Sequence, residues 1–303
     1  MNKVWVNRPY EGWICDVLAQ RFMHDNADIC VNDPHEADVI WLLADWTWRQ
    51  VPRSVLTSKK VLTTIHHIVP QKFGDVERRD FDDRDVITNA YHVFNDHTYE
   101  FIRPLTDKPI HIIQYWADTT LWKPTNTKAK LREKHGLPID AYICGSFQRD
   151  TEGAGIPNGI FLPKLEKGPD IFASYVMQLR QKCPNLYVLL AGWRRQYLIE
   201  RLENASVPFS YIELPSQVTL NELYQTLDLY PIASRFEGGP QALIECGLLN
   251  VPVVSHHVGI AEQVLPPSAI NDDLIKAIPT CPDVSNMLLP NGYEDYRNAF
   301  KWM

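Results

Sequence analysis

The arrangement of short apolar runs along the chain constrains its fold more than any other feature. Stretches with helical character separate each run from the next. The runs cover residues 4–6, 29–31, 39–43, 61–65, 93–94 and 110–113, and then 142–147, 186–191, 209–214, 229–233 and 252–255. Because such alternation is typical of parallel sheets covered by helices, the sequence predicts an α/β chain with doubly wound sheets.

The chain length and one polar segment predict two domains. With 303 residues, the chain can bury two hydrophobic cores of ordinary size. The polar, proline-containing segment 122–128 separates the apolar run at 110–113 from a new helix start. We therefore expect an N-terminal domain over residues 1–122, a C-terminal domain over residues 123–290, and a final helix within residues 291–303.

Composition excludes several classes of protein. The chain is 45% hydrophobic and 22% charged, and its net charge of −7 provides no overall positive field to attract nucleic acid or anionic membrane. No apolar run approaches membrane-spanning length, and the N-terminus lacks the apolar core of a signal peptide. The six cysteines form no Cys-x-x-Cys pair, so we interpret them as reduced thiols. These features predict a cytoplasmic protein with at most peripheral membrane contact.

The strongest functional signal follows the apolar run at 229–233. There the sequence reads Ser-Arg-Phe-Glu-Gly-Gly-Pro-Gln-Ala-Leu-Ile-Glu-Cys-Gly, and Pro240 is a favoured residue for the first turn of a helix. Gly238 and Gly239 would let a ligand approach the backbone, while the unpaired amides of the helix N-terminus favour an anion. This turn therefore predicts a cradle for a phosphate or a sugar phosphate.

Two carboxylates flank this cradle. Glu237 precedes the glycine turn and Glu245 lies inside the predicted helix, so the two cannot play the same part. The simpler alternative is a helix with an acidic loop, in which Glu245 is merely solvated. A second turn follows the run at 252–255 and contains Gly259 and Glu262. Two successive strand-to-helix turns would then line one edge of the same sheet.

With Glu237, Glu245, Gly259 and Glu262 at these spacings, residues 228–265 resemble the signature of retaining, nucleotide-sugar-dependent glycosyltransferases of the GT-B fold, in particular of the large family 4. The resemblance implies two Rossmann-like domains that face each other across a cleft, and a last helix, within residues 293–302, that crosses back to the N-terminal domain. It also implies that Glu237 orients the hydroxyls of the donor sugar and that Glu245 binds the ribose of the nucleotide.

The same resemblance implies a pair of cations that hold the donor diphosphate. Arg149 follows the apolar run at 142–147, and Lys167 belongs to a Lys-Gly pair before a predicted helix. The connection between them, residues 151–159, is longer than is usual in the family. Gln148 could therefore replace Arg149, and Lys164 could replace Lys167; either cation could also be an ordinary solvated surface charge.

The N-terminal half matches the family more weakly. Gly12 lies in a loop, residues 8–13, that resembles the glycine-containing loop of the family, although a simple strand-to-helix turn explains it equally well. His66 and His67 end a predicted strand, where relatives place a histidine against the donor sugar. Their side chains point to opposite faces, and of the two we prefer His66 for this contact. Trp46 and Trp48 are acceptor-side candidates because sugar rings stack on aromatic side chains, and the alternative is that they pack beneath a loop.

The resemblance implies catalysis without a metal or another cofactor beyond the nucleotide sugar itself. As the bond to the diphosphate breaks, Arg149 and Lys167 would stabilise the negative charge on the leaving group. The adjacent histidines at 66–67 and 256–257 cannot converge on one ion. The acceptor, a sugar, glycan or lipid, stays undefined. A nucleotide-sugar epimerase and a nonenzymatic nucleotide-sugar-binding protein are the alternatives.

Overall fold

The computed structural model describes residues 2–12, 14–153, 160–287 and 291–303, and the chain forms two units. The first unit comprises Met1–Trp116 with Leu289–Met303, and the second comprises Ala117–Leu288. The division therefore falls before the predicted break at 122–128. The reason is that this segment is bonded to the second unit, for example through the amide of Thr125, which donates to Gln225 Oε1 at 2.8 Å.

The first unit is built on a five-stranded parallel sheet with strands in sequence order. The strands are β1 (Val4–Val6), β2 (Val39–Leu42), β3 (Lys60–Ile65), β4 (Ala90–Val93) and β5 (Ile110–Ile112). The predicted strand at 29–31 is reduced to a single bridge between Cys30 and Val4. Val4 also pairs with Val39 of β2, so Cys30 and β2 lie on opposite sides of β1.

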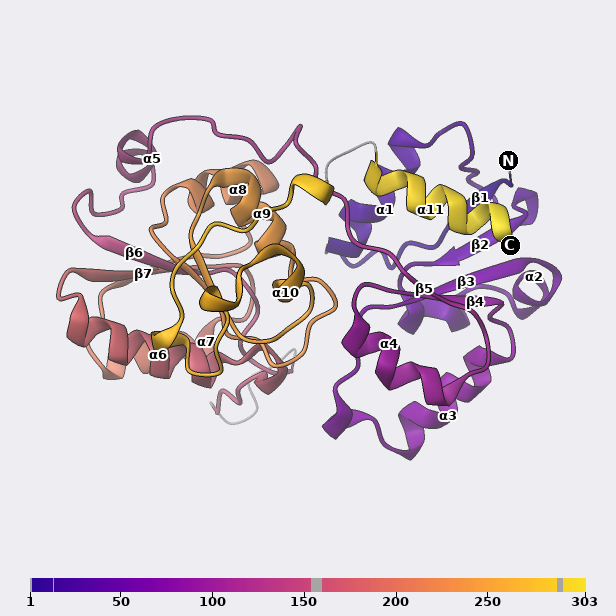
Figure 1. The fold of residues 1–303 in the computed structure, drawn as a ribbon, viewed down its shortest axis with the longest axis horizontal. Helices are drawn as coiled ribbons and strands as arrows, with labels where there is room; N and C mark the ends of the chain where they lie inside the picture. Colours follow the sequence, from indigo (N-terminus) through magenta and orange to yellow (C-terminus); the bar gives the residue numbers. More distant parts are fainter. Residues whose placement is uncertain (1, 13, 154–159, 288–290) are drawn as a thin grey trace. The chain divides into compact units, whose positions relative to one another are not determined.

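Helices cover both faces of this sheet, and the last helix of the chain is one of them. The helices of the first unit are α1 (Ile14–Asp25), α2 (Arg53–Ser58), α3 (Asp75–Asp85), α4 (Asp96–Ile102) and α11 (Asn291–Trp302). Figure 1 shows α1 and α11 on one face and α3 and α4 on the other. The ring centroid of Trp41 in β2 lies 5.0 Å from that of Phe22 in α1 and 5.1 Å from that of Tyr296 in α11. The C-terminal helix is thus part of the core of the N-terminal unit.

The second unit contains a parallel sheet whose strand order reverses in the middle. Strands β6 (Tyr142–Ser146), β7 (Leu186–Ala191) and β8 (Phe209–Ile212) form one part, and β9 (Tyr230–Ile232) pairs with β10 (Val253–Ser255). A parallel bridge between Cys144 and Leu229 places β9 beside β6. The order is therefore β8-β7-β6-β9-β10. Ligands of such sheets bind at the carboxyl ends of the strands where the order reverses, here β6 and β9.

Helices connect the successive strands of the second unit, as expected for a doubly wound sheet, and others precede its first strand and follow its last. They are α5 (Lys128–Lys134), α6 (Pro169–Lys182), α7 (Gln196–Asn204), α8 (Gln217–Gln225), α9 (Gln241–Leu249) and α10 (Ala261–Val264). The prediction of parallel, doubly wound α/β architecture is confirmed in both units. Within the described ranges, no helix is both long enough and apolar enough to cross a membrane.

Candidate active site

A cluster of four polar side chains lies at the carboxyl ends of β6 and β9. Lys167 Nζ is 2.7 Å from Glu237 Oε2, and Gln148 Nε2 donates to the backbone oxygen of Lys167 at 2.8 Å. Ser234 Oγ lies 2.9 Å from Glu237 Oε1 and 3.1 Å from Gln148 Oε1. The structure thus brings together Glu237, Lys167 and Gln148, all predicted from the sequence, and adds Ser234. The position of Ser234 directly after the apolar run at 229–233 was the signal that could have found it.

Gly168 explains why a Lys-Gly pair stands at this place. Its φ of +60° is in the left-handed region, and a Cβ added there would lie 1.8 Å from the backbone oxygen of Ala233. The start of α6 therefore packs directly on the residue that follows β9, which only glycine permits. This close approach places Lys167 beside Glu237.

The cations considered for the diphosphate contact lie in different surroundings. Lys164 Nζ lies 2.7 Å from Glu166 Oε1, whose side chain is buried, whereas Lys167 pairs with the site carboxylate Glu237. Arg149 donates to the backbone oxygens of Thr151 and Gly153, at 2.9 and 2.7 Å. Arg149 is thus held by the loop after β6. Residues 154–159, which make up most of the long connection, lie outside the described residues.

The two turns that the sequence predicts at an anion cradle lie against each other. Gly259 has a φ of +58°, and a Cβ added there would lie 2.5 Å from Pro240 Cδ and 3.1 Å from the backbone oxygen of Gly238. This confirms that both strand-to-helix turns line one sheet edge. Pro240 itself precedes the helix, because its ψ of 111° is not helical, so α9 begins at Gln241 rather than at Pro240. As the N-cap residue, proline offers no side-chain acceptor to the first amides of α9.

Glu245 is buried inside this unit. Its side chain is on the second turn of α9, and the residue is only 6% exposed, so the alternative of a solvated Glu245 is wrong. Burial raises the pKa of Glu245 to about 7, while a hydrogen bond with Tyr224 acts in the opposite direction. The ring centroid of Tyr224 lies 4.7 Å from that of Phe147, the residue that follows β6. Glu245 is therefore a carboxyl group that titrates near neutral pH.

Part of the second unit is similar to a known protein family. Residues 158–278 match the family model of glycosyl transferases group 1. The matched range contains Lys167, Ser234, Glu237 and Glu245, whereas Gln148 and Arg149 precede it. A search of the curated proteins found no match.

The fold of the chain is similar to that of solved GT-B glycosyltransferases. HepE of Anabaena, in complex with UDP and glucose, aligns over 100% of both chains with a TM-score of 0.75 and 11% identity. Sucrose-phosphate synthase of Thermosynechococcus elongatus aligns over 98% of this chain and 77% of its own, with a TM-score of 0.59 and 15% identity. A UDP-forming trehalose-phosphate synthase of Burkholderia xenovorans aligns over 96% and 79%, with a TM-score of 0.56 and 11% identity. The predicted GT-B fold is confirmed.

In the first unit, the loop with Gly12 is organised by a carboxylate. Gly12 has a φ of +72°, and its amide and that of Glu11 each donate to Asp16 Oδ2 at 2.8 Å. The amide of Tyr10 donates to Asp16 Oδ1 at 3.1 Å. The amide of Gly12 is thus bonded to Asp16, near the start of α1. Trp13, the last residue of the predicted loop, lies outside the described residues.

His66 is held at the carboxyl end of β3 by both of its ring nitrogens. Nε2 lies 2.8 Å from the backbone oxygen of Leu43, and Nδ1 lies 3.0 Å from Tyr115 Oη. Because a carbonyl oxygen can only accept, we assign the proton of the neutral ring to Nε2, which leaves Nδ1 to accept from Tyr115. This arrangement fixes the orientation of the imidazole.

The two predicted acceptor-side aromatics differ in their surroundings. Trp46 is 50% exposed, its ring centroid lies 5.8 Å from that of His66, and its Nε1 donates to Glu11 Oε1 at 3.1 Å. Trp48 is 5% exposed and packs in the hydrophobic core with Ile40. The structure therefore gives Trp48 a packing role in place of the predicted sugar contact, because a buried indole offers no face to a ligand.

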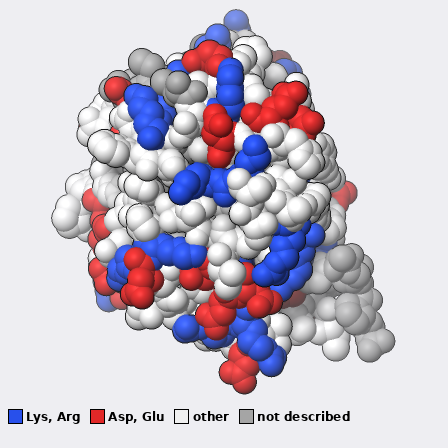
Figure 2. All heavy atoms as spheres, turned by 90° about the vertical axis from the view of Figure 1, so that its right-hand side faces the viewer, with Lys and Arg blue, Asp and Glu red and all other residues white. Residues whose placement is uncertain are grey.

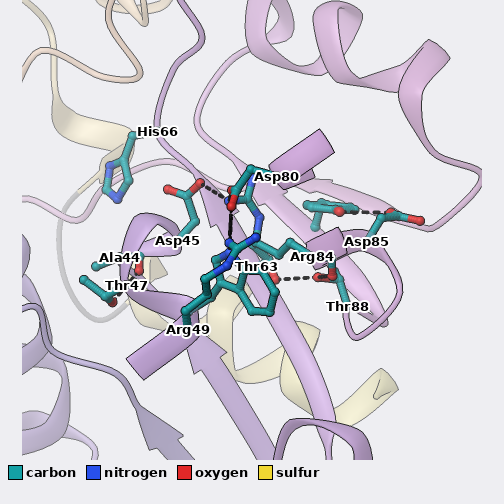
Figure 3. A network of polar contacts seen from close by, with 12 residues as sticks. Ala44, Asp45, Thr47, Arg49, Thr63, His66, Asp80, Arg84, Asp85 and Thr88 are labelled. Atoms are coloured by element: carbon teal, nitrogen blue, oxygen red, sulfur yellow. Dashed lines mark hydrogen bonds and ion pairs between the residues drawn. The ribbon is translucent and has the colours of Figure 1, made fainter. Parts of the chain in front are cut away.

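A network of charged side chains surrounds Asp45, in the segment that follows β2 of the first unit (Figure 3). Arg84 Nη1 is 3.1 Å from both Asp45 Oδ2 and Asp80 Oδ2, and Asp45 lies between Arg84 and His66. Burial raises the pKa of Asp45, and the charge of Arg84 opposes this shift. Arg49 also pairs with Asp80. These ion pairs therefore stabilise the loop that contains Trp46.

The chain contains Asp-x-Asp spacings, which in other proteins can anchor a metal, at Asp80-Phe81-Asp82 and Asp83-Arg84-Asp85 in α3. Three of the four carboxylates pair with arginines: Asp82 Oδ1 lies 2.9 Å from Arg78 Nε, Asp83 Oδ2 lies 3.1 Å from Arg49 Nη2, and Asp80 pairs with Arg84. Asp85 pairs with Lys108. In the described part of the chain, no three His, Cys, Asp or Glu side chains are grouped so that they could hold a metal ion.

Charge on the face drawn in Figure 2 is mixed in sign. On the face drawn in Figure 2, Lys and Arg side chains lie beside Asp and Glu side chains over the described residues. This pattern agrees with the net charge of −7. It differs from the continuous basic surface that is typical of nucleic-acid-binding proteins.

Proposed function

We propose that this protein is a retaining glycosyltransferase that moves a sugar from a nucleoside-diphosphate sugar, UDP-sugar being the favoured class, to a sugar, glycan or lipid acceptor. The observation that carries the proposal is the Lys167–Glu237 pair, 2.7 Å apart, at the strand reversal of the second unit, which contains the match to glycosyl transferases group 1. The HepE structures with UDP-glucose and with UDP and glucose support the choice of a UDP-sugar.

The proposed roles follow from where charge develops during transfer. Negative charge grows on the leaving diphosphate, and Lys167, Arg149 and the amides at Gly238 and Gly239 stabilise it by fixed electrostatics. The N-terminus of α9 adds its dipole to this effect. With these groups in place the reaction proceeds without a metal ion. The leaving phosphate itself serves as the base for the incoming acceptor hydroxyl.

The remaining residues of the site bind rather than react. Glu237 orients the sugar hydroxyls, Glu245 binds the ribose, and His66 contacts the donor sugar. Trp46 offers its exposed face to the acceptor. None of these side chains forms a covalent intermediate, in contrast to the paired carboxylates of retaining glycosidases.

The experiment that tests the proposal is incubation of the protein with UDP-, GDP- and ADP-sugars, with and without simple sugar acceptors, in the presence of a chelator. We expect release of a nucleoside diphosphate from one donor class and an α-linked product from an α-linked donor, observed by NMR. Binding of a donor without any product would instead support a nonenzymatic nucleotide-sugar-binding protein. A rearranged donor sugar formed without acceptor would support an epimerase.

A further inference from the structure

Ser234 occupies an unusual position for a serine side chain. The residue is 0% exposed and lies just after β9. Its hydroxyl is within hydrogen-bond distance of two oxygens, Glu237 Oε1 at 2.9 Å and Gln148 Oε1 at 3.1 Å. The amide nitrogen of Gln148 is bonded to the backbone oxygen of Lys167, which turns Oε1 of Gln148 toward Ser234. Since both oxygens can only accept, the single proton of Ser234 serves both of them.

The two oxygens of Glu237 therefore have partners of different kinds. Oε2 pairs with Lys167 Nζ at 2.7 Å, and Oε1 faces Ser234. Lysine is a point charge on a flexible stem, and a diphosphate bound at this site would compete with Glu237 for it. The hydroxyl of Ser234 is fixed by the end of a buried strand. Of these two contacts, the one with Ser234 would therefore be kept if Lys167 turned toward a phosphate.

We infer that Ser234 is a positioning residue that holds Glu237 through Oε1, so that Oε2 can bind sugar hydroxyls while Lys167 binds the diphosphate. Gln148 supports this arrangement because it ties the Ser234 hydroxyl to the backbone of Lys167. The inference rests on the proposed function. It adds that the two carboxylate oxygens of Glu237 have different functions. It also predicts that diphosphate binding to Lys167 makes Oε2 of Glu237 available to the sugar hydroxyls.

The test compares Ser234→Ala with Ser255→Ala. Ser255 is a matched control because it also is 0% exposed, ends the neighbouring strand β10, and donates to the backbone oxygen of His256 at 2.8 Å. The affinities for UDP and for UDP-glucose are measured by calorimetry, and thermal unfolding is recorded for both variants. We expect Ser234→Ala to weaken UDP-glucose binding about five- to tenfold and to change UDP binding less than about twofold. Ser255→Ala should leave the ratio of the two affinities unchanged.

A double-mutant cycle with Glu237→Gln separates positioning from general structural support. If Ser234 acts through Glu237, Ser234→Ala should cause little further loss of UDP-glucose affinity in the Glu237→Gln background. Equal weakening of UDP and UDP-glucose by Ser234→Ala would overturn the inference, as would a full additional loss in the double variant or a Glu237→Gln variant with an unchanged affinity ratio. Product formation is measured separately, so a wild-type protein that shows the affinity pattern but makes no product would refute the proposed transfer alone.

Discussion

Lys167 and Glu237 lie 70 residues apart in the sequence, and their side chains meet at 2.7 Å. Both side chains are largely buried, and each comes from a different loop at the strand reversal of the second unit. An ammonium and a carboxylate in this position can separate to bind an anion and a set of hydroxyls. The pair is therefore the central element of the proposed donor site.

Replacement of Lys167 should reduce turnover far more than replacement of Lys164. Lys167→Ala removes the cation beside Glu237, and we expect a loss of about 10²–10³-fold in kcat because charge on the leaving diphosphate is no longer stabilised. Lys164→Ala removes a pair with Glu166 and should stay within about threefold of the wild-type value. Steady-state kinetics with the donor found in the panel provide the measurement. The reverse ranking would mean that Lys164 makes the phosphate contact.

Substitution of Gly168 should destabilise the second unit. Gly168→Ala would place its Cβ 1.8 Å from the backbone oxygen of Ala233, and we expect a cost of at least about 2 kcal/mol in the free energy of unfolding. Gly136 is the matched control, because its φ is +65° but nothing lies within 4 Å of an added Cβ. Gly136→Ala should cost only the backbone strain, about 1 kcal/mol. Equal costs in urea denaturation would argue against the close approach at Gly168.

The stability of the protein should depend on pH through Glu245. The pKa of this buried carboxyl is raised from 4.5 to about 7 in the folded state, so the folded state holds more protons than the unfolded state between these values. Stability contributed by the protonated form is therefore lost as pH rises through this window. Glu245→Gln keeps the neutral form, and at pH 8 it should be more stable than the wild type by up to roughly 3 kcal/mol.

At pH 5 the difference between Glu245→Gln and the wild type should be small, because Glu245 is protonated in the folded protein. Denaturation curves of both proteins at pH 5 and pH 8 measure this difference in the free energy of unfolding. Glu262→Gln is the control, since Glu262 is exposed and pairs with His257. A Glu245→Gln variant with the same pH dependence as the wild type would contradict the burial of this carboxyl group.

Replacement of Trp46 and of Trp48 should have different effects, one on function and the other on packing. Trp48→Ala empties a core position and should cost about 3–5 kcal/mol of unfolding free energy. Trp46→Ala should leave stability within about 1 kcal/mol, because half of the residue is exposed, and should raise the KM for the acceptor. Acceptor kinetics and chemical denaturation are the measurements. An unchanged acceptor KM for Trp46→Ala would remove this residue from the acceptor site.

The sequence predicted the sheets well because buried parallel strands are continuous apolar runs. The run at 186–191 became β7 with the same bounds, since all but one of its side chains are buried. The run at 29–31 failed as a strand because its contact with β1 is a single bridge at the edge of the sheet. An apolar run indicates that a segment is buried. It does not indicate how many strands the segment pairs with.

The site was less predictable, for physical reasons that differ between residues. Trp46 and Trp48 have the same chemistry two positions apart, and only the packing of the loop after β2 buries one of them. Similarly, the direction of the loop after β6 decides that Gln148, rather than its neighbour Arg149, reaches the backbone of Lys167. Ser234 gains its role from a partner three residues away and another 86 residues away. Such directions depend on tertiary contacts that local sequence does not encode.

The most direct test of the central claim is the distance from Lys167 Nζ to the nearest diphosphate oxygen in a crystal structure of the protein with UDP. The proposed site predicts a charge-assisted hydrogen bond of about 2.8 Å to that oxygen. It also predicts that Glu237 keeps its contact with Ser234. A diphosphate bound elsewhere, with Lys167 still paired to Glu237, would contradict the account.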